Sequence, residues 1–303
     1  MKQTNNQRTL IAYIAIILSM IFWGISFVWT KELLNANFPV FLILTTRLLI
    51  SSILMFTTFF LLHKLEKIQK KDIYKFLLLA FFEPFLYFVG ENFSMHYVDA
   101  SFAAIMIALL PIVNPIALYI FNKEKIGWNL LFGVIISIVG ITIMSINPEG
   151  QITISWQGVL LLLLAVFAGA GYTIILSRLI HKYSPITITT YQNIIGIFYF
   201  LPCLLIFDLG KISSVAWSTE AIISLILLAV FCSSGAFMLY SYGAKIISVL
   251  KVSVFTNAIP VVTIIVAVIL GQEQFSIPKI LGIVIVVLGL LLTQFGFNKK
   301  KKI

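Results

Sequence analysis

The chain has 303 residues, of which 60% are hydrophobic and only 11% are charged, and its mean hydropathy is +1.07. A soluble domain carries about 25% charged residues, so this composition excludes an ordinary soluble protein and indicates an integral membrane protein. The net charge of +10 does not indicate a nucleic-acid partner, because the basic residues lie between apolar runs, where they act as topology signals.

Ten apolar runs follow one another along the chain, each close to the roughly 20 residues that a helix needs to cross a ~30 Å hydrocarbon core. Barrel strands are not expected, because such strands alternate in polarity over about 10 residues. The first run is too long for a signal peptide and is expected to remain as a transmembrane helix. The predicted helices cover residues 10–31, 40–62, 74–98, 101–121, 128–147, 157–180, 186–207, 219–243, 250–270 and 278–297.

Four sparse residues recur with the same spacing of 149 residues in the two parts of the chain. They are Pro111, Glu124, Gly133 and Gly140 in the first part, and Pro260, Glu273, Gly282 and Gly289 in the second. Such self-similarity predicts two copies of one unit, residues 1–150 and residues 151–303. Five helices per copy is an odd number, so the second copy is expected to enter the membrane inverted. Inverted repeats are typical of secondary transporters.

Lysine and arginine residues predict the orientation of the chain. With the N-terminus in the cytoplasm, 17 of the 21 basic residues fall on the cytoplasmic side. Only Lys31, Lys211 and Lys279 fall on the other side, and Arg47 lies within a helix. This asymmetry predicts a multi-pass membrane protein with ten spans and both termini in the cytoplasm.

A series of short motifs runs along the chain in a fixed order. The first copy contains Trp23-Gly24-x-x-Phe27, Lys31, Pro39, Arg47 and Glu91-Asn92-Phe93-Ser94-Met95-His96-Tyr97. The second copy keeps Arg178 and Pro185 but has Gly171-Tyr172 and Asn193 at the positions of Trp-Gly and Arg47. Over essentially the whole chain, this series resembles the drug/metabolite transporter superfamily, specifically the EamA-type ten-helix transporters. The resemblance implies two inverted five-helix bundles around a central cavity. It also implies that the protein carries amino acids, other small metabolites or drugs across the bacterial inner membrane.

Three ionisable residues within predicted helices are candidates for gating or coupling, because a charge inside the membrane is costly. Arg47 and Glu91 each lie about seven residues from the outer end of their helices, or about 10 Å deep at 1.5 Å per residue. We expect them to pair, either as an outer gate or as a structural link between the two helices. Glu83 has no basic partner in the sequence, so it is either a proton carrier or a water-linked carboxyl group.

Amide and aromatic side chains within the apolar runs are the candidates for substrate binding. Amides can bind substrate groups but also commonly join one helix to another, and aromatic walls suit ring-bearing substrates but also pack against lipid. The candidates are Trp23, Tyr87, Asn92, Asn114, Tyr172, Gln192, Tyr240 and Asn257. Glycines spaced seven apart predict that helices 128–147 and 278–297 pack closely as supports, either between the two copies or between protomers.

The predicted function is secondary transport of small organic metabolites by alternating access, with export expected. Two alternatives remain: a membrane-embedded enzyme or lipid-linked flippase, and a non-transporting scaffold. An enzyme would need a clustered acid–base or metal constellation, and the sequence shows none, so no catalytic residue, metal site or cofactor is predicted. The expected partners are a small-molecule substrate, the lipid bilayer and, as a candidate coupling ion, the proton. A monomer and a homodimer are both compatible with the sequence.

Overall fold

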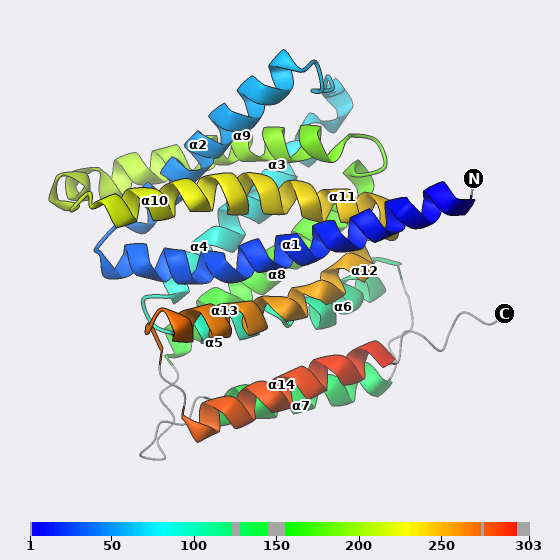
Figure 1. Ribbon diagram of the computed structural model, residues 1–303, viewed down its shortest axis with the longest axis vertical. Coiled ribbons are helices and arrows are strands. Elements are labelled where there is room, and N and C mark those ends of the chain that lie inside the picture. The colour runs from blue at the N-terminus through cyan, green and yellow to red at the C-terminus, as the bar shows by residue number, and fades with distance from the viewer. Residues whose placement is uncertain (1, 123–127, 145–154, 274–275, 296–303) are drawn as a thin grey trace.

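The structure is a computed structural model that describes residues 2–122, 128–144, 155–273 and 276–295, and these residues form helices with no strand among them (Figure 1). Among these residues, each predicted run overlaps one or more helical segments. The α-helices are α1 (Lys2–Asn35), α2 (Val40–Leu61), α3 (Ile73–Ala80), α4 (Tyr87–Ser94), α5 (Ala100–Ile107), α6 (Leu110–Asn122), α7 (Trp128–Met144), α8 (Trp156–Leu179), α9 (Pro185–Cys203), α10 (Thr219–Leu227), α11 (Phe237–Ile247), α12 (Val249–Ser253), α13 (Ala258–Ile269) and α14 (Ile277–Phe295).

Tighter or wider helical turns join several of these helices. They are the 3-10 segments η1 (Lys70–Asp72), η4 (Leu209–Ser214) and η6 (Val254–Asn257), and the π-helical segments η2 (Phe81–Leu86), η3 (Leu204–Asp208) and η5 (Leu228–Ala236). Within the described residues, seven continuous helical stretches are long and apolar enough to cross a membrane, and the apolar helices at Ala100–Asn114 and Ile277–Gly289 are shorter. A total of ten spans therefore stays a prediction.

The third predicted helix is interrupted at Glu83, which the sequence analysis did not anticipate. Glu83 has φ −146° and ψ 118°, an extended conformation inside η2, and Pro84 follows it. The residue before a proline is biased towards extended conformations, so Pro84 was the signal for this break. A second π-helical segment, η5, lies where the predicted spacing of 149 residues would place the counterpart of η2.

Pro111 and Pro260 both lie in the first turn of a helix. Pro111 follows the turn at residues 108–109 that separates α5 from α6, and Pro260 follows η6 at the start of α13. Proline is tolerated in a first turn because its missing N–H would have no intrahelical partner there. The helical segments Ala100–Asn114 and Lys251–Ile269 therefore continue through a tighter turn just before each proline.

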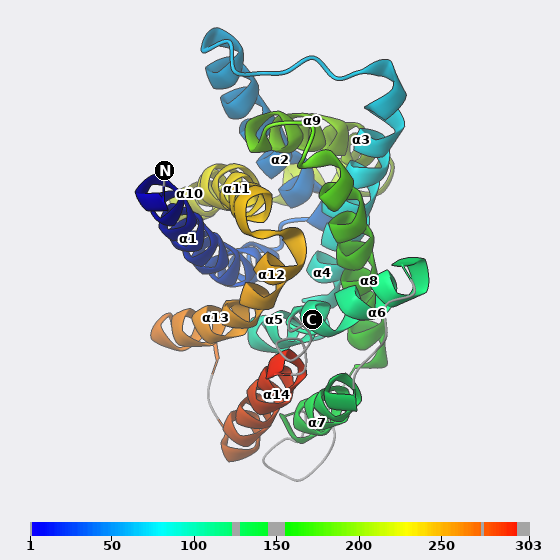
Figure 2. The ribbon, with the colours of Figure 1, turned by 90° about the vertical axis from the view of Figure 1, so that its right-hand side faces the viewer.

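Helices α7 and α14 form a separate pair along one edge of the molecule (Figures 1 and 2). A methyl group added to Gly140 would lie 2.7 Å from the carbonyl oxygen of Gly282, and one added to Gly289 would lie 2.8 Å from that of Gly133. The two backbones approach each other at these glycines, as small residues permit between membrane helices. The predicted close packing of these helices is confirmed.

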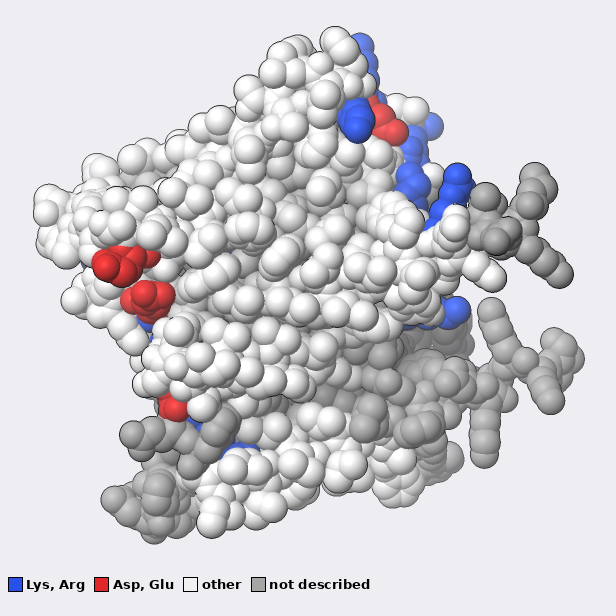
Figure 3. Space-filling model, in the orientation of Figure 1, with Lys and Arg blue, Asp and Glu red and all other residues white. Residues whose placement is uncertain are grey.

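Charged side chains gather at two opposite ends of the molecule. Figure 3 shows mostly Lys and Arg at the end where α1 begins and mostly Asp and Glu at the other end, with an uncharged belt between them. The belt carries exposed apolar side chains such as Leu10, Ile53 and Phe198. Apolar exposure of this kind suits a surface that faces lipid.

A cluster of polar contacts joins two connections at the basic end. Asp72 is buried and accepts hydrogen bonds from Tyr183 at 2.9 Å and from Lys75 at 2.8 Å, and it also pairs with Lys182. The backbone N–H of Ser184 donates to the Glu66 carboxylate at 2.6 Å. The connection between α2 and α3 is thereby tied to the connection between α8 and α9.

A second cluster lies at the opposite end. Lys279 pairs with Glu273 at 2.6 Å and with Asp99 at 3.2 Å, and Glu273 also accepts a hydrogen bond from the backbone N–H of Ser101 at 2.9 Å. Glu273 therefore both pairs with Lys279 and caps the start of α5. Glu124, its counterpart in the first copy, lies outside the described residues.

Candidate functional site

A buried pocket with about 570 Å³ of space between its atoms, part of it open to solvent, lies among the helices. Its walls come from α1, α2, η2, α4, α5, α6, α8, α11, α12, η6 and α13. Among the described residues, α7 and α14 contribute nothing to its lining, in keeping with their predicted supporting role. Helix α9, which was also expected to line the cavity, contributes nothing either.

Eight of the eleven predicted site residues line this one pocket. They are Trp23, Arg47, Glu83, Tyr87, Glu91, Asn114, Tyr172 and Tyr240. The other three, Asn92, Gln192 and Asn257, lie outside the lining. Their amide atoms are buried, and the Gln192 amide lies beside the Tyr172 hydroxyl group.

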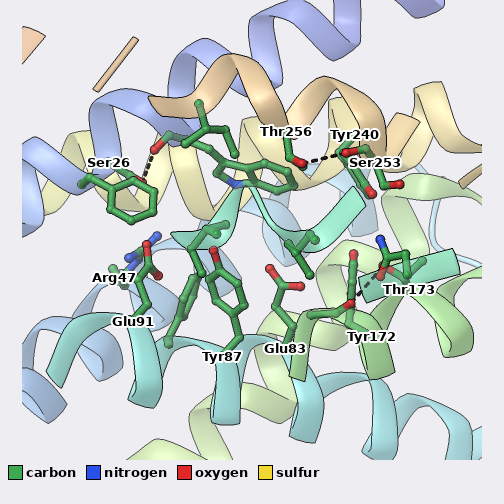
Figure 4. A pocket seen from close by; sticks show the side chains of 18 residues that line it. Ser26, Arg47, Glu83, Tyr87, Glu91, Tyr172, Thr173, Tyr240, Ser253 and Thr256 are labelled. Carbon is green, nitrogen blue, oxygen red and sulfur yellow. Dashed lines mark hydrogen bonds between the residues drawn. The ribbon is translucent and has the colours of Figure 1, made fainter. Parts of the chain in front are cut away.

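Arg47 is held at one end of the pocket by α4 and η5. Its Nε–H donates to the Ser233 hydroxyl at 2.9 Å, and its guanidinium carbon lies 4.4 Å from the centroid of the Phe88 ring. Figure 4 shows Glu91 beside Arg47, as predicted for neighbouring helices. These two described side chains nevertheless form no ion pair within 4.0 Å, because Ser233 and Phe88 hold the guanidinium group. They therefore interact as nearby charges and not as a direct salt bridge.

A polar network behind Arg47 connects α2, α9 and η5. The Asn193 amide donates to the Ser51 hydroxyl at 2.7 Å and to the Ser233 carbonyl at 2.8 Å. The Ser51 and Ser234 hydroxyls are 2.6 Å apart. Buried polar groups that are hydrogen-bonded in this way fix the positions of neighbouring helices. The serines were not predicted, although Ser233-Ser234 in an apolar helix was a visible signal.

Glu83 lies further along the same pocket, between Tyr87 and Tyr172 (Figure 4). Its side chain is only 7% exposed. Within the described part of the chain it forms no ion pair within 4.0 Å and no hydrogen bond. The extended backbone at Glu83 places this carboxyl group at the break between α3 and α4.

Aromatic rings line the side of the pocket that faces the two glutamates. The Trp23 ring lies 5.1 Å from Tyr240 and 5.0 Å from Phe237, measured between centroids, and Tyr172 contacts the same Phe237 at 6.3 Å. Trp23 on α1 and Tyr172 on α8 therefore meet the same ring on α11. Trp23 and Tyr172, which were predicted to occupy corresponding places in the two copies, thus contact the same residue.

Hydroxyl groups complete the polar part of the lining, and the sequence analysis did not single them out. Ser26 donates to the Trp23 carbonyl at 2.6 Å, Thr173 to the Gly169 carbonyl at 2.9 Å, and Thr256 to the Ser253 carbonyl at 2.7 Å. Each is hydrogen-bonded within its own local segment, and its oxygen can still accept a hydrogen bond from a ligand. Serine and threonine are too common in membrane helices for their positions to identify a site.

Proteins with similar sequences are named as transporters or as a WAT1-related protein. An uncharacterized transporter of Archaeoglobus fulgidus is 28% identical over 281 residues, which cover 92% of this chain and 96% of the relative. The uncharacterized transporter YetK of Bacillus subtilis is 26% identical, with 96% of this chain and 88% of YetK covered. A WAT1-related protein of Arabidopsis thaliana is 22% identical, with 90% and 79% covered.

A solved crystal structure shares the fold, with a TM-score of 0.67 at 16% sequence identity over 95% of this chain and 98% of the other. The model of the EamA-like transporter family matches residues 10–146 and residues 156–295. The two matched segments together span most of the chain. The protein is therefore a multi-pass membrane transporter that belongs to the EamA-like transporter family.

Proposed function

We propose that this protein is a secondary transporter that exports small organic solutes across the inner membrane of a bacterium by alternating access. One observation carries the proposal: Arg47, Glu83 and Glu91, which lie within apolar helices, all reach the same buried pocket. Ionisable groups at membrane depth are costly and usually mark a pathway for a substrate or ion. A bundle that served only as a scaffold would gain little from burying three of them around a cavity.

The interrupted helices support the alternating-access part of the proposal. The breaks at Glu83 and at residues 108–109 lie beside the pocket, and η5 and η6 lie at the corresponding places of the second half. Discontinuous helices at matching positions of two inverted repeats are typical of secondary transporters. We therefore propose two inverted five-helix repeats, residues 1–150 and residues 151–303, with both termini in the cytoplasm.

Reconstitution into liposomes tests the transport proposal directly. The purified protein is reconstituted and supplied with labelled amino acids, amines and other small metabolites, with and without a pH gradient. We expect at least one solute to move in a protein-dependent manner and to be competed by its unlabelled form. Movement of no solute under any condition would contradict the proposal, and transport that ignores the pH gradient would contradict proton coupling.

A further inference from the structure

The ionisable groups of the pocket do not balance in charge. The described lining contains two carboxyl groups, Glu83 and Glu91, and one guanidinium group, Arg47, and no other Asp, Glu, Lys or Arg. With all three groups ionised, the pocket has one net negative charge. Arg47 and Glu91 lie together at one end (Figure 4), so the unbalanced charge belongs to Glu83. A net charge at membrane depth is unfavourable, and one bound monovalent cation would remove it.

Glu83 has the surroundings of a ligand-binding group. Its side chain is 7% exposed, lines the cavity, and has no hydrogen bond or ion pair with another described residue. Buried carboxyl groups normally have such partners. The buried hydroxyl group of the neighbouring Tyr172 lies beside Ser241 and Gln192, and its oxygen can still accept a further hydrogen bond. A ligand N–H group between them would satisfy the carboxylate and the phenol oxygen together.

Aromatic rings near Glu83 suit the same kind of ligand. Trp23 and Tyr240 both line the pocket and contact each other, with their ring centroids 5.1 Å apart. Tyr87 and Tyr172 flank the carboxyl group (Figure 4). The faces of aromatic rings attract organic cations, and tryptophan does so most strongly. Apolar side chains, including Ile107, Leu110 and Ile259, line the remaining wall and would contact the body of such a ligand.

We propose that the substrate is a monovalent organic ammonium compound with an apolar or aromatic body, whose nitrogen binds Glu83 and whose body packs against Trp23 and Tyr240. This proposal rests on the transport function proposed above, because it names the substrate class for the same pocket. A zwitterion fits less well, since its carboxylate would reach Arg47 only by approaching the negative charge of Glu91. An anion would add to the negative charge that is already present.

Three probes of nearly the same shape test the charge preference. Binding of 2-phenylethylamine, phenylalanine and 3-phenylpropionate to the detergent-solubilised full-length protein is measured with radiolabelled probes at pH 7. We expect the amine to bind at least about tenfold more tightly than either other probe. Glu83→Gln should abolish this preference, and Glu83→Asp, which keeps the charge, should retain most of it.

A matched control separates the site from a general effect of removing a carboxyl group. Glu220 lies exposed in the first turn of α10, outside the pocket, so Glu220→Gln should bind the amine as the unaltered protein does. Size-exclusion profiles establish that each variant is folded. Equal or tighter binding of phenylalanine, or an amine preference that persists in folded Glu83→Gln, would overturn the proposal.

A transport measurement distinguishes failure of this inference from failure of the transport function. Counterflow in liposomes uses radiolabelled 2-phenylethylamine, and protein-free liposomes measure the movement of its neutral form across lipid, which is subtracted. Glu83-dependent binding without counterflow of any probe would support the ammonium site and contradict transport. Counterflow of phenylalanine alone would support transport and overturn the ammonium site.

Discussion

Arg47 is among the largest side chains that the described part of the protein buries almost completely. Its charge is tolerated because Ser233 accepts its Nε–H, the Phe88 ring lies against it, and Glu91 lies nearby. A buried charge that loses its partner is strongly unfavourable, whereas removal of both charges can be nearly neutral. The two charges should therefore depend on each other even though they form no direct salt bridge.

We predict that Glu91→Gln alone destabilises the folded protein by on the order of 1–3 kcal/mol, because the buried guanidinium group loses its compensating charge. Arg47→Met with Glu91→Gln should be less destabilised than the sum of the two single variants. Thermal unfolding in detergent and transport by each variant measure this coupling. Strictly additive losses would show that the two charges act independently.

The sequence predicted those site residues whose type is rare within apolar helices. It failed where the prediction depended on which way a side chain points from its helix. Arg47, Glu83 and Glu91 stand out because charges are scarce in apolar helices, and all three reach the pocket. Asn92 and Gln192 were equally rare but do not line it. A helix that is apolar on all sides has no amphipathic pattern, so the sequence does not show which face turns inward.

At the scale of the helices, the ends and the apolar runs were predictable because length and hydropathy determine them. The interruptions at η2 and η5 were not, since a π-helical turn has no compositional signature of its own. Only Pro84 announced one of them, through its effect on the residue before it. The prolines at 111 and 260 were recognised as a repeated pair, but the tighter turns just before them were not predicted.

The pairing of α7 with α14 depends on glycine at the contact. We predict that Gly289→Val destabilises the protein by about 1–3 kcal/mol, the usual effect of overpacking, because the new side chain would begin 2.8 Å from the Gly133 carbonyl oxygen. Ligand binding at a temperature where the variant is folded should change little, since neither helix lines the pocket in the described residues. Thermal unfolding and probe binding measure the two effects.

Gly210 offers the control for this substitution. It lies in η4 with no atom within 4 Å of an added methyl group, so Gly210→Val should leave the unfolding temperature close to that of the unaltered protein. If Gly289→Val were as stable as Gly210→Val, the close approach of α7 and α14 would contribute little to stability.

For the molecule as a whole, the sequence predicted the membrane class and the gathering of basic residues at one end, which Figure 3 shows. It did not predict the contacts that join distant connections at these ends. Asp72 meets Lys182, which is 110 residues away, and Lys279 meets Asp99, which is 180 residues away. Charged residues in short connections are common, and nothing in their local sequence identifies which partners the fold brings together.

These two clusters lie at opposite ends of the molecule, and each joins the first half of the chain to the second. A transporter that alternates between two openings must release the contacts at one end while those at the other end persist. Asp72→Asn removes the charge that pairs with Lys75 and Lys182. Lys279→Gln does the same for Asp99 and Glu273. The two substitutions should therefore shift the population of states in opposite directions.

We predict that Asp72→Asn increases, by several-fold, the reaction of a cysteine at Thr173 with a membrane-impermeant thiol reagent added from the basic end. The background is a protein without Cys203 and Cys232, the two native cysteines. Lys279→Gln should lower that reaction, because loosening the acidic end favours the state that is closed at the basic end. If both substitutions raised the reaction equally, they would be loosening the fold in general, and the clusters would not act as alternating closures.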